Sequence, residues 1–535
     1  MTQRKRKQRL APPPAPKPVA PRFPRLQAAM PIVLQVLQIM GGMLLVAAIV
    51  FSDAQIARHK FFWLDEGAEI ETNCQVTPLT TGRSTGGYFP VYYSLQRVAT
   101  DYWPRYDESI LVGYRLVSLA FVGISMGTLY AVLHWQLGAA WAYLALATLA
   151  GQNIFHFYAA ESRPYFAWLA CFVLALLAAA VAGNLDWQKL RKREYGLLVA
   201  ACLLLTLVAT PGVGQAATLL FTCGLCWRLL APTPIPWSRA LLLIAPPVGL
   251  MVALWFYYAG GMSSAAPDIN NLVVELQQGE TKLLVEVLRL LFAGPHPVPG
   301  LEIGIPNGSA PVLQALNLLM LAGVVAPVFW WRQRATLDRP TRFLFVLTIC
   351  ALVQILLSIL IAIGLAFRYY FVAKMFIYLI ACYAVLVLAG AHLLTQFALH
   401  TFPRSRQLTT VLARGALPAL VVLLVARHVQ NYNAAYWLKY DGFIKSAEIS
   451  CSVWGDTTKF YRKAQSSPEI PFNMIVTIAE KMRRCPLPAA DQRKAMSYVV
   501  LSSSSGFETG LDFLNKPPAG VPVLSYCGRE VLIAR

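Results

Sequence analysis

Long apolar runs with few charges recur along the chain between residues 30 and 427. Most of them are about 20 residues long, which is the length that an α-helix needs to cross the hydrocarbon core of a bilayer. Eleven runs qualify as candidate spans, at 30–51, 110–133, 139–158, 164–183, 195–210, 213–230, 240–258, 311–331, 343–366, 371–394 and 412–427. The pattern therefore predicts an all-α polytopic membrane protein with about 11 transmembrane helices.

The segments outside the spans divide the chain into three parts. Residues 1–28 are basic and rich in proline, which predicts a disordered cytoplasmic leader. Residues 29–427 form the transmembrane domain, with long external loops at 52–109 and 259–310. Residues 428–535 mix helix-like stretches with strand-like ones at 496–503 and 528–535, so we expect a small soluble α/β or α+β domain there.

Composition excludes a purely soluble or a disordered protein. Hydrophobic residues make up 57% of the chain and charged residues 13%, about half the charged share of a soluble domain. The net charge of +20 suggests nucleic-acid binding until the charges are placed. The basic residues cluster before residue 26 and beside apolar runs, and no aromatic stacking platform accompanies them, so we expect no nucleic-acid partner.

Charge asymmetry between the connecting segments predicts the orientation. The segments assigned to the cytoplasm hold 21 Lys and Arg against three acids, and the two external loops hold 7 against 13. This is the distribution that the positive-inside rule describes. We therefore expect a multi-pass protein of the bacterial inner membrane, with a cytoplasmic N-terminus and a periplasmic C-terminal domain.

The ten cysteines fit this arrangement. Four are predicted to lie outside, Cys74, Cys451, Cys485 and Cys527, where an oxidising compartment permits pairing with three possible connectivities. The other six lie in predicted spans. Cys223 and Cys226 have the spacing of a metal or redox pair, but inside an apolar helix packing is the simpler interpretation.

A pair of adjacent carboxylates, Asp65 and Glu66, follows an aromatic cluster near the end of the first span. Aromatic residues of this kind favour the membrane interface, where a carboxylate is partly desolvated and suited to accept a proton. A solvated acidic loop is the alternative interpretation.

A second candidate is the sequence Glu161-Ser162-Arg163-Pro164-Tyr165 between the third and fourth spans. Proline favours the first turn of a helix and disfavours helical geometry in the residue before it, so Arg163 is predicted to lie in the turn. An arginine beside a helix N-terminus suits a phosphate. The alternative is a Glu161–Arg163 pair that only shapes the turn.

Cations also occur at the outer ends of other predicted spans. Arg368 precedes Tyr369 at the junction of spans nine and ten, and Lys374 lies about one turn further into the apolar run. Arg115 lies early in the second span. Arg368 can also extend to the interface, whereas buried membrane charges usually have a partner, such as a carboxylate or an aqueous cavity.

Five segments in order resemble motifs of integral-membrane glycosyltransferases of the GT-C fold, and within them the bacterial protein-O-mannosyltransferase-like and lipid A sugar-transferase-like branch (glycosyltransferase families 39 and 83). These segments are 63–66 (WLDE), 88–95 (YFPVYYSL), 113–118 (GYRLVS), 160–165 (AESRPY) and 368–370 (RYY). Two departures occur: Ser162 replaces a small apolar residue, and Ala373-Lys374 replaces leucine-proline. Residues 428–535 lie outside the resemblance.

The resemblance implies an inverting transfer of a sugar from a polyprenyl-phosphate donor to a lipid, polysaccharide or protein acceptor at the outer leaflet. It implies that Asp65 is the general base and that Glu66 orients Asp65 or the acceptor. Cationic stabilisation of the leaving lipid phosphate would come from Arg163, Arg368 and Lys374. Supporting roles would fall to Glu161, Tyr165, Tyr369 and Arg115.

We expect no cofactor and no obligatory metal, because the adjacent acids lack Asp-x-Asp spacing and no His/carboxylate ligand spacing is present. Two other classes fit a chain with many spans. A transporter or lipid flippase would more often show internal repeats and broken helices near the midplane. An assembly subunit would act through residues 428–535.

Overall fold

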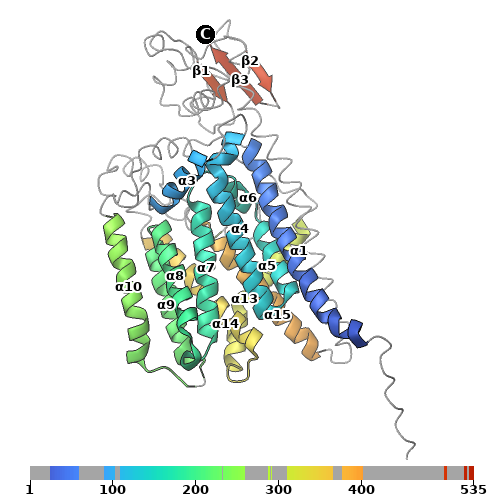
Figure 1. Ribbon diagram of the computed structural model, residues 1–535, viewed down its shortest axis with the longest axis vertical. Coiled ribbons are helices and arrows are strands. Elements are labelled where there is room, and N and C mark those ends of the chain that lie inside the picture. Colours follow the sequence, from blue (N-terminus) through green and yellow to red (C-terminus); the bar gives the residue numbers. More distant parts are fainter. Residues whose placement is uncertain are drawn as a thin grey trace, which may run out of the picture.

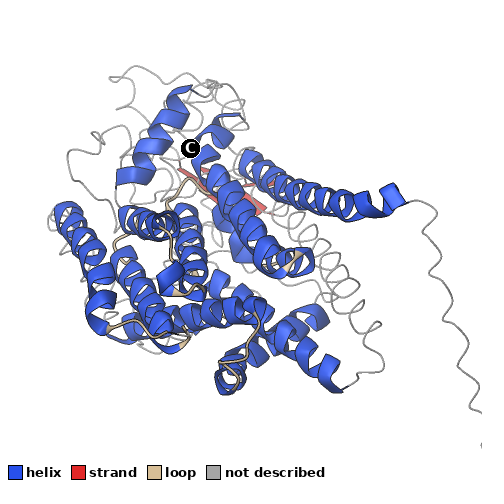
Figure 2. Ribbon diagram, turned by 60° about the horizontal axis from the view of Figure 1, so that its bottom comes forward, coloured by secondary structure: helices blue, strands red, loops and turns tan. Residues whose placement is uncertain are grey.

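The computed structural model describes residues 24–59, 90–102, 109–231, 233–259, 287–288, 291, 310–364, 376–401, 499–502, 523–526 and 529–534. This part of the chain is mostly α-helical, and its strands are confined to one small sheet (Figures 1 and 2). The helices are α1 Pro24–His59, α3 Pro90–Tyr102, α4 Ser109–Leu137, α5 Ala139–Ala150, α6 Asn153–Ala159, α7 Tyr165–Asn184, α8 Lys192–Val208, α9 Gly212–Leu229, α10 Trp237–Ala259, α13 Ala310–Arg332, α14 Arg339–Gly364 and α15 Leu379–Thr401.

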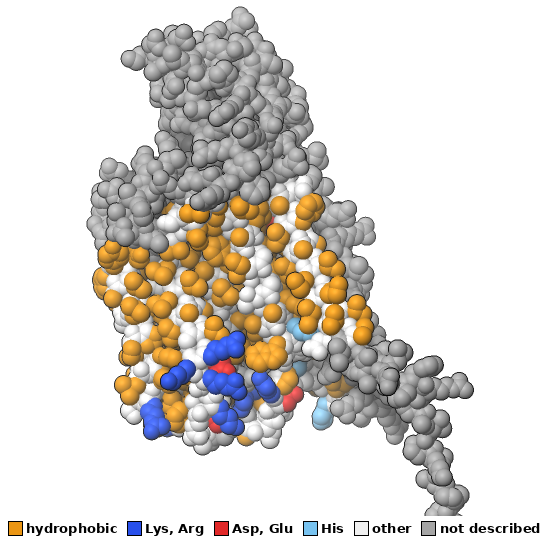
Figure 3. All heavy atoms as spheres, in the orientation of Figure 1, with side chains coloured by type: hydrophobic (Ala, Val, Ile, Leu, Met, Phe, Trp, Pro, Cys, Tyr) orange, Lys and Arg blue, Asp and Glu red, His pale blue; other side chains and the backbone are white. Residues whose placement is uncertain are grey.

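Seven of the described helices are long and apolar enough to cross a membrane, within α1, α4, α7, α10, α13, α14 and α15. Large apolar side chains are exposed on the outside of the bundle, and apolar side chains spread over the middle part of the face in Figure 3. Such a surface would drive aggregation in water but suits contact with lipid tails. The described helices therefore form a multi-pass membrane bundle. The helix α7 lies at its centre, buried along 83% of its span against 11% for α1.

Nine of the eleven predicted spans correspond to single described helices, with shifted ends. The helices α8 and α9, of 17 and 18 residues, occupy the two short candidates at 195–210 and 213–230. The largest shift concerns the candidate at 371–394, because α15 runs over Leu379–Thr401. The candidate at 412–427 lies outside the described residues, so the total of eleven stays a prediction.

The prediction of one continuous helix over 139–158 is wrong. The chain leaves helical geometry at Gln152, whose φ is −85° and ψ is 123°, and this residue separates α5 from α6. Hydropathy does not detect the interruption, because apolar residues continue on both sides of the polar pair Gln152 and Asn153. The order of spans is unchanged, but the second half becomes a short helix that leads into the turn at 160–164.

The connection between α4 and α5 is also shorter than the predicted loop 134–138. The helix α4 continues to Leu137, and Gly138 alone separates it from Ala139. Gly138 has φ 97° and ψ 166°, a conformation that is essentially restricted to glycine. This residue therefore allows the chain to reverse direction within a single position.

Replacing this glycine should destabilise the protein. We expect Gly138→Ala to lower the free energy of unfolding by about 1–3 kcal/mol, because a Cβ is strained at this backbone geometry. The measurement is thermal unfolding of the detergent-solubilised protein. Gly127→Ala is the matched control: a Cβ at this helical glycine would meet no atom within 4 Å, so helix propensity should make it neutral or slightly stabilising. Equal unfolding temperatures for the two variants would contradict the prediction.

Basic side chains gather at one end of the bundle, the lower end in Figure 3. They belong to the connections α7–α8, α9–α10 and α13–α14. At this end Asp338 caps α14 by accepting the backbone N–H of Thr341 at 3.0 Å, and Arg342 donates to the Asn184 carbonyl at 2.8 Å at the C-terminus of α7. The helices α3 and α6 lie toward the opposite end (Figure 1).

The described strands near the C-terminus form an antiparallel sheet of order β1-β3-β2, with β1 Val499–Ser502, β2 Val523–Tyr526 and β3 Arg529–Ala534. Its register pairs Val500 with Ile533 and Leu524 with Val531. The strand-like stretches at 496–503 and 528–535 contain β1 and β3, so these two strand predictions are confirmed. The proposal of a complete domain over 428–535 stays a prediction, because most of it lies outside the described residues.

Candidate functional site

The turn that carries Arg163 lies between α6 and α7. The helix α6 ends at Ala159, and α7 begins at Tyr165 with Pro164 at its N-cap position, where φ is −69°. The Pro164 carbonyl accepts the N–H of Trp168 at 2.9 Å, which closes the first turn of α7. The predicted placement of Arg163 between the two helices is confirmed, and Pro164 lies one position before the helical turn expected for it.

The side chains of this turn are buried although two of them are charged. Glu161 is 2% exposed and Arg163 is 8% exposed. The guanidinium carbon of Arg163 lies 4.8 Å from the centre of the Tyr165 ring, which itself packs against Tyr158 with ring centres 5.1 Å apart. The ring faces a cation in a poorly hydrated place, where electrostatic interactions are stronger than in water.

The helices α3 and α4 are joined to this turn through hydrogen bonds. The Ser118 hydroxyl of α4 donates to the Glu161 carbonyl at 2.7 Å, and Tyr92 of α3 lies 2.9 Å from the same hydroxyl oxygen. Since Ser118 has one hydroxyl hydrogen and directs it at a carbonyl, the Tyr92 hydroxyl is the donor in that second bond. Residues far apart in sequence thus form one buried chain of hydrogen bonds.

Gln96 of α3 is a part of the site that sequence reasoning missed. Its side-chain amide is buried and donates to the Ser162 hydroxyl and, at 3.4 Å, to the Ser162 carbonyl. A small apolar residue at 162, as in the resembled motif, would leave the Gln96 amide without that hydroxyl. Gln96 is thus the hydrogen-bond partner of the one side chain in this segment that differs from the motif. The signal available in the sequence was the position of Gln96 directly after the 88–95 segment.

Arg115 is fully buried on α4 and donates to the Ala57 carbonyl of α1 at 2.7 Å. The carbonyls in the last turn of a helix have no intrahelical partner, and an arginine stabilises them through both hydrogen bonding and the helix dipole. This contact fastens the end of α1 to α4. The helix end is a partner that the sequence did not predict, and the expected carboxylate or aqueous cavity stays a prediction.

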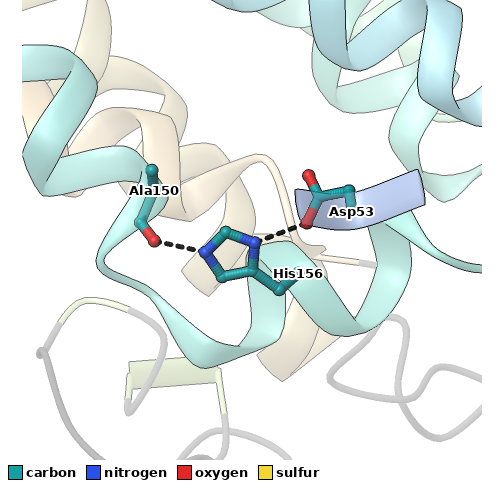
Figure 4. A network of polar contacts seen from close by, with 3 residues as sticks. All are labelled: Asp53, Ala150 and His156. Carbon is teal, nitrogen blue, oxygen red and sulfur yellow. Dashed lines mark hydrogen bonds and ion pairs between the residues drawn. The ribbon is translucent and has the colours of Figure 1, made fainter. Parts of the chain in front are cut away.

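A buried carboxylate–imidazole pair was not predicted at all. Asp53 on α1 is 0% exposed and His156 on α6 is 1% exposed, with 2.6 Å between Oδ1 and Nδ1 (Figure 4). The other ring nitrogen, Nε2, lies 2.6 Å from the Ala150 carbonyl. Asp53 had been assigned to the external loop, but α1 continues to His59 and places it inside the bundle.

Several predicted site residues lie outside the described residues. These are Asp65, Glu66, Arg368, Tyr369 and Lys374. The four cysteines predicted to lie outside the membrane, Cys74, Cys451, Cys485 and Cys527, lie there as well. Their proximity to the turn at 160–164, and any pairing among the cysteines, stay predictions.

Potential metal ligands in the described part do not gather. No group of three or more His, Cys, Asp or Glu among these residues has a geometry that would hold a metal ion. The six cysteines predicted to lie in spans, Cys171, Cys202, Cys223, Cys226, Cys350 and Cys382, are all buried free thiols. Cys223 and Cys226 are buried, as their interpretation as packing residues expects.

Comparison with family models and with curated proteins finds no match for the chain. Among solved structures, ArnT from Cupriavidus metallidurans bound to undecaprenyl phosphate matches at 13% identity with a TM-score of 0.47, over 92% of this chain and 97% of that chain. Apo ArnT from the same organism matches at 13% identity with a TM-score of 0.46, over 95% and 98%. The oligosaccharyltransferase of Archaeoglobus fulgidus, tethered with an acceptor peptide, matches at 13% identity with a TM-score of 0.39, over 75% and 57%.

Proposed function

We propose that this protein is an inverting glycosyltransferase of the GT-C type that moves a sugar from a polyprenyl-phosphate donor to a periplasmic or outer-leaflet acceptor. One observation carries the proposal: parts of three segments that resemble GT-C motifs, 88–95, 113–118 and 160–165, meet in one buried polar cluster. The cluster includes the Tyr92–Ser118 and Ser118–Glu161 hydrogen bonds. A single site built from these three segments requires that they converge in this way, and the cluster supports the proposal for that reason.

The cluster suits the phosphate of a lipid-linked donor. Arg163 is a nearly buried cation at the N-terminus of α7, a helix of 20 residues whose first turn has no side-chain cap. The positive end of the helix dipole adds to its charge. A departing lipid phosphate needs such stabilisation more than it needs a general acid. We assign Arg368 and Lys374 the same task and Glu161, Tyr165, Tyr369 and Arg115 supporting roles.

The proposed reaction is a single displacement at the anomeric carbon. Asp65 takes the proton from the acceptor hydroxyl while the hydroxyl oxygen bonds to the anomeric carbon. The bond between that carbon and the phosphate oxygen breaks, with inversion at the carbon, and the lipid phosphate leaves. Glu66 orients Asp65 or the acceptor. The acceptor is a lipid, a polysaccharide or a protein, and the chemistry requires neither a metal nor a cofactor.

The proposed location is the bacterial inner membrane, with the site facing the periplasm. Two features support this orientation. The basic connections gather at one end of the bundle, as the positive-inside rule expects for the cytoplasmic end. The turn at 160–164 lies at the end of α7 remote from the basic connection that follows Asn184.

Arg163→Ala tests the phosphate assignment. We expect the dissociation constant for undecaprenyl phosphate to rise about tenfold to a hundredfold, since a charge-assisted hydrogen bond contributes about 1.5–3 kcal/mol. Binding to the purified full-length protein can be measured by tryptophan fluorescence in detergent. Arg334→Ala, an exposed arginine of the α13–α14 connection, is the matched control and should bind like wild type. Unchanged binding by Arg163→Ala would refute the assignment.

A transporter or lipid flippase is the alternative class, and interrupted helices such as α5–α6 also occur in transporters. The two functions differ in their products. A glycosyltransferase should change the envelope glycans or glycolipids detected by mass spectrometry when the protein is present. Lipid movement without any new glycosidic product would favour a flippase instead.

A further inference from the structure

The Asp53–His156 pair holds together the place where the α5–α6 helix is interrupted. Because α5 ends at Ala150, the carbonyl of this residue lacks the partner that a continuous helix would provide. The His156 ring on α6 supplies one through Nε2, and its Nδ1 reaches Asp53 on α1 (Figure 4). One imidazole therefore connects both sides of the interruption and a third helix.

The Asp53–His156 pair has a net charge of zero, because the two side chains together hold one proton between them besides the hydrogen on Nε2. A carbonyl oxygen can only accept, so Nε2 carries a hydrogen. One further proton lies between Nδ1 and Oδ1, on either the ring or the carboxyl group, and the summed charge is zero in both cases. A net charge of zero lowers the cost of burying the pair inside an apolar bundle. Burial of such a pair does not show that it stabilises the fold, because apolar residues often replace a buried ion pair without loss of folding stability. A contribution to stability therefore does not by itself account for the pair.

The pair belongs to a closed circuit of contacts around the turn at 160–164. Asp53 lies four residues before Ala57, whose carbonyl binds Arg115 of α4. On α4, Ser118 follows one turn after Arg115 and binds the carbonyls of Glu161 at 2.7 Å and Arg163 at 3.4 Å. The turn leads back to His156 through the bond from the Ala160 N–H to the His156 carbonyl at 3.3 Å.

We propose that Asp53 and His156 are positioning residues, which fix the α5–α6 interruption against α1 and thereby set the position of the Arg163 turn for the donor phosphate. This inference rests on the proposed function. A catalytic role is disfavoured by geometry: both ring nitrogens are already engaged, and neither side chain is open to a substrate. Their effect on transfer is therefore exerted through the backbone of the turn.

The replacement of both residues by leucine tests the proposal. Asp53→Leu/His156→Leu keeps an apolar interior but removes the link between Ala150 and α1. We expect the dissociation constant for undecaprenyl phosphate and the KM for the donor to rise about tenfold, with kcat changed by less than about threefold. Hydrogen–deuterium exchange of peptides covering 153–165 should become faster.

The conservative variant Asp53→Asn distinguishes positioning from proton transfer. An asparagine amide can donate to Nδ1 of a neutral His156 whose Nε2 hydrogen still binds Ala150, so the circuit survives without an exchangeable carboxyl proton. We expect binding, KM and exchange within about threefold of wild type. His392→Ala, which removes the 3.0 Å contact of that ring with Thr341 at the other end of the bundle, is the control and should leave binding unchanged.

The experiments distinguish failure of the positioning proposal from failure of the proposed donor. Wild-type binding, KM and exchange in the double-leucine variant would overturn the proposal, and so would an Asp53→Asn variant as impaired as the double variant. If the double variant does not fold, Asp53→Ala gives the same comparison, because it frees α1 and leaves the His156–Ala150 contact. A wild-type protein that binds no undecaprenyl phosphate would refute the proposed donor, and the exchange measurement would still decide whether the pair fixes the turn.

Discussion

Asp65→Asn is expected to abolish sugar transfer while leaving undecaprenyl phosphate binding within about threefold of wild type. The amide has nearly the shape of the carboxylate but cannot take a proton from the acceptor hydroxyl. A positioned general base contributes about 10²–10⁴ to the rate, so turnover should fall by at least two orders of magnitude. Turnover of a radiolabelled polyprenyl-phosphate sugar by the purified full-length protein measures the loss.

Glu69→Gln is the matched control for this experiment. It neutralises another acid of the same external loop, one to which no catalytic role is assigned, and it should retain transfer. Separate measurement of binding and turnover matters, because loss of both would indicate a damaged fold rather than a missing base. Unimpaired transfer by Asp65→Asn would end the proposed mechanism.

Gly390→Ala is expected to be among the most destabilising single substitutions in the bundle. Gly390 on α15 and Gly323 on α13 mark the crossing of these helices, where a Cβ on Gly390 would overlap the Leu319 carbonyl oxygen and one on Gly323 the Leu386 carbonyl oxygen. Backbone atoms cannot rotate away as a side chain can, so the helices must separate. We expect a loss of about 2–4 kcal/mol in the free energy of unfolding.

Gly249→Ala on α10 serves as the control, because a Cβ at this lipid-facing glycine would meet no atom within 4 Å. Unfolding in mixed micelles should separate the two variants clearly. The double variant Gly323→Ala/Gly390→Ala should be less destabilised than the two single losses added, since one separation of the helices relieves both overlaps. Full additivity, or a neutral Gly390→Ala, would show that the helices do not cross this closely.

The sequence predicted those parts of the candidate site that depend on neighbouring residues in the chain. Arg163 was predicted to lie in a turn because proline constrains the residue before it, and the structure confirms that placement. Asp53 was misplaced because hydropathy ends the first span at residue 51, whereas α1 continues to His59. A polar residue at the end of an apolar run looks like the start of a loop, and only a partner on another helix reveals that it is buried.

The amino-acid sequence by itself determined the membrane class and the approximate positions of the described spans, because a bilayer imposes the same length and apolarity on every crossing helix. Tertiary structure decided what no local pattern contains. It interrupted the third span at Gln152, joined Gln96 to Ser162, and fastened α1 through Ala57–Arg115 and Asp53–His156. Hydrogen bonds between helices depend on which faces meet when the bundle packs, and pairs separated by dozens of residues share no signal in sequence spacing.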